Sequence, residues 1–259
     1  MSMRISLTIL CSAVLGLAAS CAQAISGGVG IAPNDTRFDS VAGVTLTEWV
    51  GINNVFGNAT LVAANRVVLP RHLINRNFPN RRSVDGTAGA FTIRFRRTPD
   101  GLVGTADNPA SFHHVRVKEW IFPTGRKDTD DVVIGILETP VTHIAPAVVD
   151  MKAKVNKRSV LSVVSWGPVA VQLSTPVSKG TPLAGSVAVT SFDKNKFRIG
   201  PPSPAAPAGV VPNDSGTPIL QINGGVVKIV GFVTTTTGGV SLQQLEGTRL
   251  FPRAPRARR

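Results

Sequence analysis

The run from Asn213 to Pro218, Asn-Asp-Ser-Gly-Thr-Pro, sets a serine hydroxyl beside a glycine. Glycine permits a tight turn, so the amide N–H groups of Ser215 and Asn213 can point at one small volume. Two such donors can stabilise the oxyanion of a tetrahedral intermediate, which is usually the largest contribution to acyl-transfer catalysis. Asp-Ser-Gly is also an ordinary turn sequence. The run therefore indicates a nucleophile only if the chain also supplies a base and an acid.

A serine nucleophile needs a neighbouring base, and four histidines are available. His72 comes three residues after the end of the apolar run 67–69, where the end of a strand would hold its ring rigidly. His113 and His114 are expected in a polar loop, and His143 in a loop that follows a proline. Histidines in such settings are usually structural or solvated. His72 is therefore the predicted base.

The base in turn needs an acid that orients its ring. Asp131 immediately precedes the apolar run 132–137, so its carboxylate is expected at the mouth of a core strand. A metal-dependent hydrolase is a weaker alternative, because the adjacent His113 and His114 lack the helical spacing of zinc ligands. We expect neither a metal nor a cofactor.

The pattern that must position these side chains is β throughout. Short apolar or alternating runs are separated by Gly, Pro, Asn and Asp, with no long helical period. In one of them, 91–95, the apolar residues Phe91, Ile93 and Phe95 alternate with Thr92, Arg94 and Arg96. This alternation predicts a half-buried strand with a basic outer face. A mixed, basic stretch at 146–158 is the expected linker between two similar all-β halves. The expected strands are 59–63, 66–69, 91–95, 115–122, 132–137, 159–165, 186–192, 196–199, 218–222 and 226–233.

The start of the chain resembles an export signal. Residues 1–24 comprise a basic start, an apolar run and small residues ending at Ala24, which predicts a cleaved signal peptide and a soluble secreted or periplasmic protein. The apolar run is shorter than a membrane span requires, and no later stretch approaches that length. Both cysteines, Cys11 and Cys21, fall inside the signal. An alternative is lipoprotein processing, with Cys21 as the lipidated residue.

The formal net charge of +13 favours attraction to anionic surfaces. Its densest cluster is the tail 249–259, which we expect to be a solvated, disordered end. The alternative is a docking segment for nucleic acid, phospholipid or an acidic partner. The sequence carries no signal for an oligomeric state.

Several segments, in this order, resemble those of chymotrypsin-like (trypsin-fold) serine proteases of the bacterial secreted type. Residues 61–69, running on to His72, are similar to the histidine segment of that family, and residues 131–141 to its aspartate segment. Trp166-Gly167 resembles the opening of its second barrel, and 213–218 its serine segment. Residues 25–28 are similar to its mature amino terminus.

The resemblance implies two packed six-stranded antiparallel β-barrels, one spanning 25–148 with His72 and Asp131 and one spanning 149–248 with Ser215. It implies hydrolysis of protein or peptide substrates through an acyl-enzyme, with an oxyanion hole formed by Asn213 and Ser215. It also implies that the Ile25 ammonium, once released, pairs with Asp214. Departures from the family pattern are Ser26, Arg71, Asn213 and Thr217.

The same resemblance implies a primary substrate pocket with Gly209 at its base and Thr234 and Thr236 in its wall. With no carboxylate at the base, the expected preference is for small or medium apolar side chains. A function of another class is a protease-like binding protein of little or no activity, which uses its basic surface to hold an anionic partner.

Overall fold

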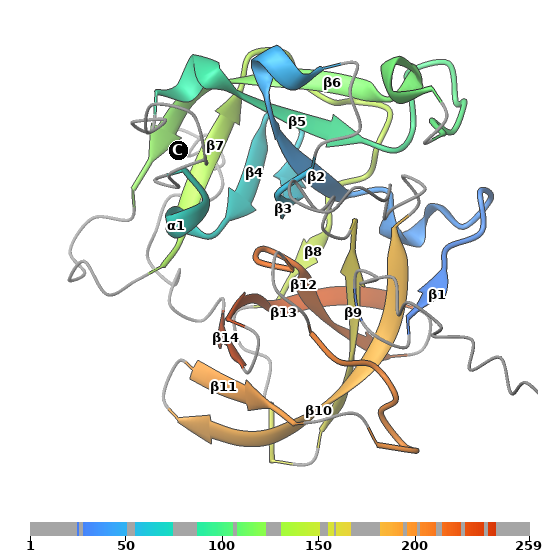
Figure 1. The fold of residues 1–259 in the computed structure, drawn as a ribbon, viewed down its shortest axis with the longest axis vertical. Coiled ribbons are helices and arrows are strands. Elements are labelled where there is room, and N and C mark those ends of the chain that lie inside the picture. Colours follow the sequence, from blue (N-terminus) through green and yellow to red (C-terminus); the bar gives the residue numbers. More distant parts are fainter. Residues whose placement is uncertain are drawn as a thin grey trace, which may run out of the picture.

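The computed structural model describes residues 25, 28–50, 55–74, 87–105, 108–122, 131–150, 155–157, 159–166, 182–193, 196–200, 203–210, 214–223, 226–235 and 238–241. Its fold is all-β, as the short apolar runs predict. One closed six-stranded antiparallel barrel packs against one eight-stranded sheet (Figure 1). The predicted signal peptide, 1–24, and the basic tail, 249–259, lie outside the described residues.

The closed barrel has the strand order β2-β3-β4-β7-β6-β5. Its core is apolar and contains the buried side chains Leu46, Leu61, Leu69 and Phe91. Short helical turns lie between its strands or just before them: the one-turn α1 (Arg71–Ile74) and the 3-10 turns η1 (Thr36–Phe38), η2 (Thr47–Trp49), η3 (Ala88–Ala90) and η4 (Pro109–Ser111). The strands are β2 (Val41–Leu46), β3 (Gly57–Ala63), β4 (Arg66–Leu69), β5 (Phe91–Phe95), β6 (His113–Ile121) and β7 (Val133–Leu137).

The eight-stranded sheet has the order β1-β10-β11-β14-β13-β12-β9, and β8 adds to β13 in parallel. Strand β9 pairs with β10 as well as with β12. The predicted linker 146–158 contains β8, and the predicted domain boundary between 148 and 149 falls inside that strand. The strands are β1 (Val29–Gly30), β8 (Val148–Val149), β9 (Val160–Ser165), β10 (Leu183–Asp193), β11 (Lys196–Ile199), β12 (Pro218–Asn223), β13 (Val226–Thr235) and β14 (Gly238–Ser241).

A second apolar cluster joins the barrel to the sheet. It combines Val41 and Ile134 of the barrel with Leu220 and Phe232 of the sheet, around the fully buried Trp166. The indole N–H of Trp166 donates to the carbonyl of Val41 at 3.0 Å, so its polar edge is satisfied. This cluster covers the outer surface of the barrel where the two units meet.

The prediction of a basic outer face on β5 is wrong, because this cluster covers Arg94 and the segment 31–39 covers Arg96. Arg94 and Arg96 are each 1% exposed. The guanidinium carbon of Arg94 lies 4.1 Å from the ring centre of Phe112 and 5.8 Å from that of Trp166. Burial lowers the pKa of Arg94 to about 10, which still leaves it charged at neutral pH. The two arginines thus point away from the barrel core but into neighbouring chain rather than water.

The placement of His113 and His114 in a polar loop is also wrong. Both residues begin β6, where they pair with Phe95 and Arg94 of β5. The ladder with β5 continues two residues beyond the apolar run that the sequence pattern marks, which is why the strand starts earlier. The His113 ring packs edge-on against that of His143 at 4.8 Å between ring centres.

Candidate active site

His72 lies on α1, the single helical turn that follows strand β4. The turn buries Leu73 and Ile74 completely and leaves the His72 side chain 42% exposed. Leu73 packs so closely on Gly57 of β3 that a Cβ at Gly57 would lie 2.5 Å from its Cδ1 atom. Packing of two apolar side chains on the barrel therefore holds the imidazole at the surface in a fixed position.

Asp131 holds the His72 ring from one side. Its Oδ2 atom lies 2.6 Å from Nδ1 of His72, and its Oδ1 atom accepts the backbone N–H of His72 at 2.8 Å. Asp131 stands two residues before β7, next to the buried Val132, so the core strand fixes its backbone. Two contacts to one residue set both the position and the tilt of the imidazole.

Ser215 lies on the other side of the same ring. Its Oγ atom is 2.9 Å from Nε2 of His72. With Nδ1 facing a carboxylate, the neutral ring carries its proton on Nδ1, so Nε2 is left to accept the serine proton. The structure thus joins Asp131, His72 and Ser215 in one chain of hydrogen bonds, although they come from two units and are up to 143 residues apart.

Gly216 makes the turn that presents Ser215. Its φ is +85°, a left-handed conformation that favours glycine, and a Cβ there would lie 1.8 Å from the carbonyl oxygen of Asn58. The Gly216 N–H donates to the carbonyl of Val233 on β13 at 2.8 Å, and the Asn58 N–H donates to the Ser215 carbonyl at 2.7 Å. The serine backbone is therefore fixed to the barrel and to the sheet at once.

The amide N–H of Ser215 is one of the two predicted oxyanion donors. Among the described residues it donates to no acceptor in the protein. Ser215 is half-buried, and an N–H that donates to none of the described residues is available to an acceptor outside the protein. The second predicted donor, Asn213, lies outside the described residues.

Asp214 turns away from the serine into a polar network of which the sequence predicts only the Ile25 contact. It is fully buried, and its carboxylate accepts from the Ile25 nitrogen at 3.3 Å and from the Ser165 hydroxyl at 2.7 Å. The amide of Asn58 donates in turn to Ser165 at 3.0 Å and to Thr217 at 3.2 Å. The only signal for this network is the presence of polar Asn58 and Ser165 within apolar strands, because a buried amide or hydroxyl needs a partner.

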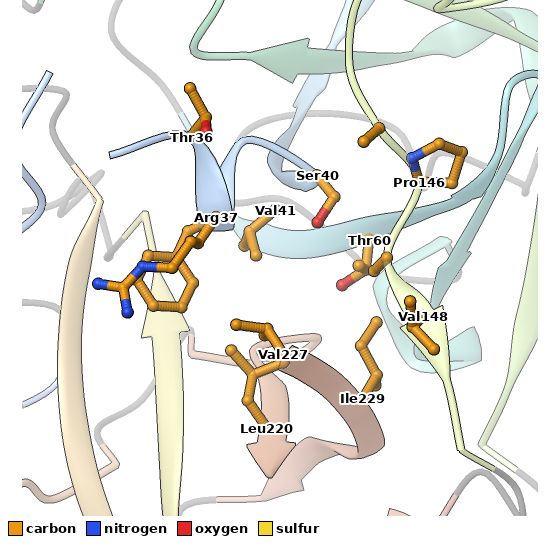
Figure 2. Close-up of a pocket in the computed structure, with 13 residues that line it drawn as sticks. Thr36, Arg37, Ser40, Val41, Thr60, Pro146, Val148, Leu220, Val227 and Ile229 are labelled. Atoms are coloured by element: carbon orange, nitrogen blue, oxygen red, sulfur yellow. The ribbon is translucent and has the colours of Figure 1, made fainter. Parts of the chain in front are cut away.

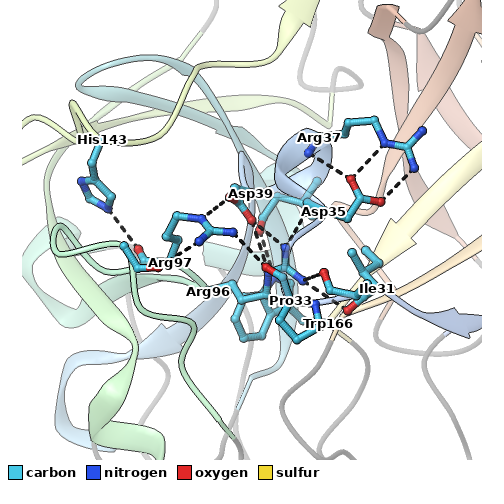
Figure 3. A network of polar contacts seen from close by, with 12 residues as sticks. Ile31, Pro33, Asp35, Arg37, Asp39, Arg96, Arg97, His143 and Trp166 are labelled. Atoms are coloured by element: carbon cyan, nitrogen blue, oxygen red, sulfur yellow. Dashed lines mark hydrogen bonds and ion pairs between the residues drawn. The ribbon is translucent and has the colours of Figure 1, made fainter.

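The segment that leads to Ile25 is tied to the barrel by two arginines (Figure 3). Arg96 donates to the carbonyl of Asp35 at 2.7 Å and to those of Ile31 and Ala32 at 3.3 and 3.2 Å. Both Arg96 and Arg97 also donate to the carboxylate of Asp39, at 2.7 and 2.6 Å. We call residues 31–39 with these two arginines the N-terminal clamp. The clamp fixes the position on the barrel from which the N-terminal segment extends back to Ile25 and its contact with Asp214.

Ile25 itself is fully buried and has a positive φ of 51°. Its side chain packs near Gly185 of β10, where a Cβ would lie 3.1 Å from its Cγ2 atom. In the full chain the Ile25 nitrogen is the amide that follows Ala24. Release at this bond would turn it into an ammonium facing a buried carboxylate.

The predicted substrate pocket is only partly within the described residues. Thr234 is half-buried on β13 and follows Val233, the residue that bonds Gly216 and Thr217. Gly209 is buried beside Ala208, whose N–H donates to Ser186 of β10. No hydrogen bond in the described part of the chain joins Gly209 to Ser215, and Thr236 lies outside it.

Within the described ranges, no three His, Cys, Asp or Glu side chains lie close enough to hold a metal ion. None of the helices in those ranges has the length and hydropathy that a membrane crossing requires. In comparisons with known proteins, no family model matches this chain and no curated protein matches it.

Proposed function

We propose that this protein is a serine endopeptidase of the chymotrypsin-like type. The observation that carries the proposal is the His72 ring, which lies within hydrogen-bond distance of the Asp131 carboxylate on one side and of the Ser215 hydroxyl on the other. A nucleophile, a base and an orienting acid that lie side by side in this order in space are the arrangement used for acyl transfer. The arrangement is recognised by its geometry and not by the positions of the residues in the sequence.

In the proposed acylation step, Ser215 Oγ attacks the scissile carbonyl carbon as its proton passes to Nε2 of His72. Asp131 keeps Nδ1 protonated and stabilises the imidazolium that forms. The carbonyl oxygen becomes an oxyanion, which the N–H groups of Ser215 and Asn213 stabilise. The C–N bond then breaks, and His72 returns the proton to the leaving amine.

Deacylation repeats the sequence with water. His72 takes a proton from the water as its oxygen attacks the acyl carbon, and the proton returns to Ser215 Oγ when the ester bond breaks. Every proton that leaves a nucleophile goes to a leaving group, so the cycle regenerates the resting state without a cofactor.

We further propose that signal processing after Ala24 activates the enzyme. The buried Asp214 carboxylate beside the Ile25 nitrogen supports this, because a buried anion is costly unless a cation or hydrogen bonds compensate it. A released Ile25 ammonium would complete the pair and order the neighbouring oxyanion hole. The protein would then be secreted or periplasmic.

Two finer features belong to the same proposal. Pairing of β9 with both β10 and β12 supports a second barrel of six strands. The position of Thr234 next to Val233, and a glycine at 209, support a shallow pocket for small or medium apolar side chains. Residues 25–148 and 149–248 are the two proposed barrel domains.

The decisive experiment is labelling of the purified protein, with a confirmed Ile25 terminus, by a fluorophosphonate probe, with mass spectrometry to map the adduct. We expect labelling confined to Ser215 and lost in His72→Ala, while His143→Ala, at a histidine outside the site, labels like the wild type. Folded wild-type protein that is not labelled would contradict the proposal. Salt-sensitive binding to an anionic polymer, unchanged in Ser215→Ala, would then favour the binding-protein alternative.

A further inference from the structure

A cavity of about 240 Å³ lies where the barrel and the sheet meet, and none of His72, Asp131 and Ser215 lines it (Figure 2). Val41 of β2 and Thr60 of β3 form its barrel side, and Leu220 of β12 with Val227 and Ile229 of β13 form its sheet side. The wall is therefore mainly aliphatic and is contributed by both units.

Three hydroxyl-bearing residues line the cavity, and two of them, Ser40 and Thr60, are buried in its wall, whereas Thr36 is exposed at its edge. Ser40 and Thr60 are only 6% and 4% exposed, and in Figure 2 both side-chain oxygens are directed into the cavity. Neither hydroxyl has a side-chain hydrogen bond with any described residue. They lie close together because Thr60 pairs with Val41, the neighbour of Ser40, across the β2–β3 ladder. Neither oxygen is among the buried side-chain atoms that lack a partner, so both hydroxyls are accessible from the cavity and available to the polar group of a ligand.

The described lining of the cavity offers a ligand no unpaired charge. Arg37 is the only ionisable side chain among the described residues that line it. Its Nε and Nη2 atoms donate to the two carboxylate oxygens of Asp35 at 2.9 and 2.8 Å, so the guanidinium is already paired. A charged ligand would lose its hydration here without gaining an ionic partner.

We propose that this cavity is a binding site for a small neutral amphiphile, with an aromatic or branched aliphatic body and one hydroxyl or carbonyl group. The body would pack on Leu220, Val227 and Ile229, and the polar group would exchange hydrogen bonds with Ser40 and Thr60. The volume exceeds the roughly 150 Å³ of an apolar cavity that holds benzene and is below the roughly 300 Å³ at which drug-sized pockets begin. A ligand of about ten non-hydrogen atoms fits this range. The proposal does not depend on the proposed peptidase activity.

The test uses 3-phenylpropan-1-ol, an alcohol of this size, in a titration followed by amide chemical shifts of the purified protein. We expect saturable binding with a dissociation constant on the order of 0.1–1 mM, with the largest shifts at Val41 and Ile229. Propylbenzene, which lacks the hydroxyl, should bind about 3- to 10-fold more weakly, as one lost hydrogen bond predicts. At ten times its dissociation constant the alcohol should raise Tm by about 3 °C.

Variants distinguish binding in this cavity from non-specific hydrophobic binding elsewhere on the protein. Thr60→Val keeps the shape and removes one hydroxyl, so it should weaken binding of the alcohol about 3- to 10-fold and leave binding of propylbenzene unchanged. Thr190→Val, on an exposed part of β10, is the matched control and should change neither. Val227→Phe should abolish binding of both by filling the cavity, provided that its amide spectrum is that of a folded protein. No saturable binding by wild type, or alcohol binding unaffected by both Thr60→Val and Ser40→Ala, would overturn the proposal.

Discussion

The position of the Ser215 hydroxyl depends on the residue that follows it. Gly216 combines a φ of +85° with a position where a Cβ would lie 1.8 Å from a backbone oxygen. Gly216→Ala therefore adds a steric clash with Asn58 to the cost of the left-handed conformation. We expect it to lower the free energy of unfolding by about 3–5 kcal/mol, measured by urea denaturation.

Gly101 provides the matched control. Its φ is +84°, almost the same, but a Cβ there would meet no atom within 4 Å. Gly101→Ala should therefore cost only the conformational part, about 1–2 kcal/mol. Equal losses in the two variants would mean that the chain relaxes around Gly216 and that the contact with Asn58 does not fix the serine.

Asp131 makes two contacts to His72, and only one of them bears on the tautomer. In Asp131→Asn the side chain still reaches the ring but no longer favours a proton on Nδ1, nor does it stabilise the imidazolium. If the proposed function holds, kcat on a peptide or ester substrate should fall on the order of 10⁴-fold with little change in Tm. Asp100→Asn, at an exposed carboxylate of another loop, should leave kcat unchanged; a similar kcat in both variants would contradict the role of Asp131.

At the scale of elements, the N-terminal clamp links the barrel to the segment that ends at Ile25. Asp39 is the carboxylate that balances two guanidinium groups, and the Arg96 side chain is only 2% exposed. Asp39→Asn would leave buried positive charge without its anion, which typically costs about 3–5 kcal/mol. We expect that loss in urea denaturation, together with faster hydrogen exchange along 31–39.

The exposed pair of Asp35 and Arg37 allows a direct comparison in the same segment. The Arg37 side chain is 54% exposed, so Asp35→Asn should cost far less than Asp39→Asn. A loss for Asp39→Asn no larger than that for Asp35→Asn would show that solvent reaches Arg96 and that the clamp does not depend on charge.

The elements that sequence reasoning recovers are those with a local pattern. The hairpins β3–β4 and β12–β13 follow from turn residues between apolar runs, and β7 from a continuous apolar run. The sequence pattern does not predict strand β2, because Gly43 and Thr45 interrupt its apolar residues and leave neither a continuous apolar run nor a clear alternation, although all six residues are buried. Local pattern does not reveal which strands are covered on both faces.

The same limit applies to the candidate site. The places of His72, Asp131 and Ser215 at strand ends and in a turn mark them as candidates, and the structure brings them together, while their catalytic roles stay predictions. The partners of Asp214 were not predictable beyond Ile25. Asn58 and Ser165 meet it only through packing of the barrel on the sheet, and such long-range polar contacts leave almost no local signal.

At the scale of the whole molecule, the junction of the two units buries titratable side chains beside one another. His114 pairs with Arg94 across the β5–β6 ladder. Burial, and then the positive charge of Arg94, lower the pKa of His114 from 6.5 to about 4. Burial, and then His143, lower the pKa of His113 in the same direction. Both histidines are therefore kept neutral in the folded protein at pH values where they gain a proton in the unfolded chain.

This difference gives stability a pH dependence of defined sign. Between pH 6.5 and about 4 the unfolded state binds more protons than the folded state, so the free energy of unfolding falls as the pH falls through this window. His114 should contribute about 1–2 kcal/mol of this loss once solvent screening is allowed for. Urea denaturation at pH 8 and pH 4.5 should show a smaller loss in His114→Gln than in wild type. Measurement at pH 8, where His114 is neutral in both states, isolates the packing cost of the substitution. Carboxylates begin to titrate by pH 4.5, but they are the same in both proteins, so their contribution cancels in the comparison. Equal losses in the two proteins would mean that the junction opens to water at low pH before His114 can destabilise it.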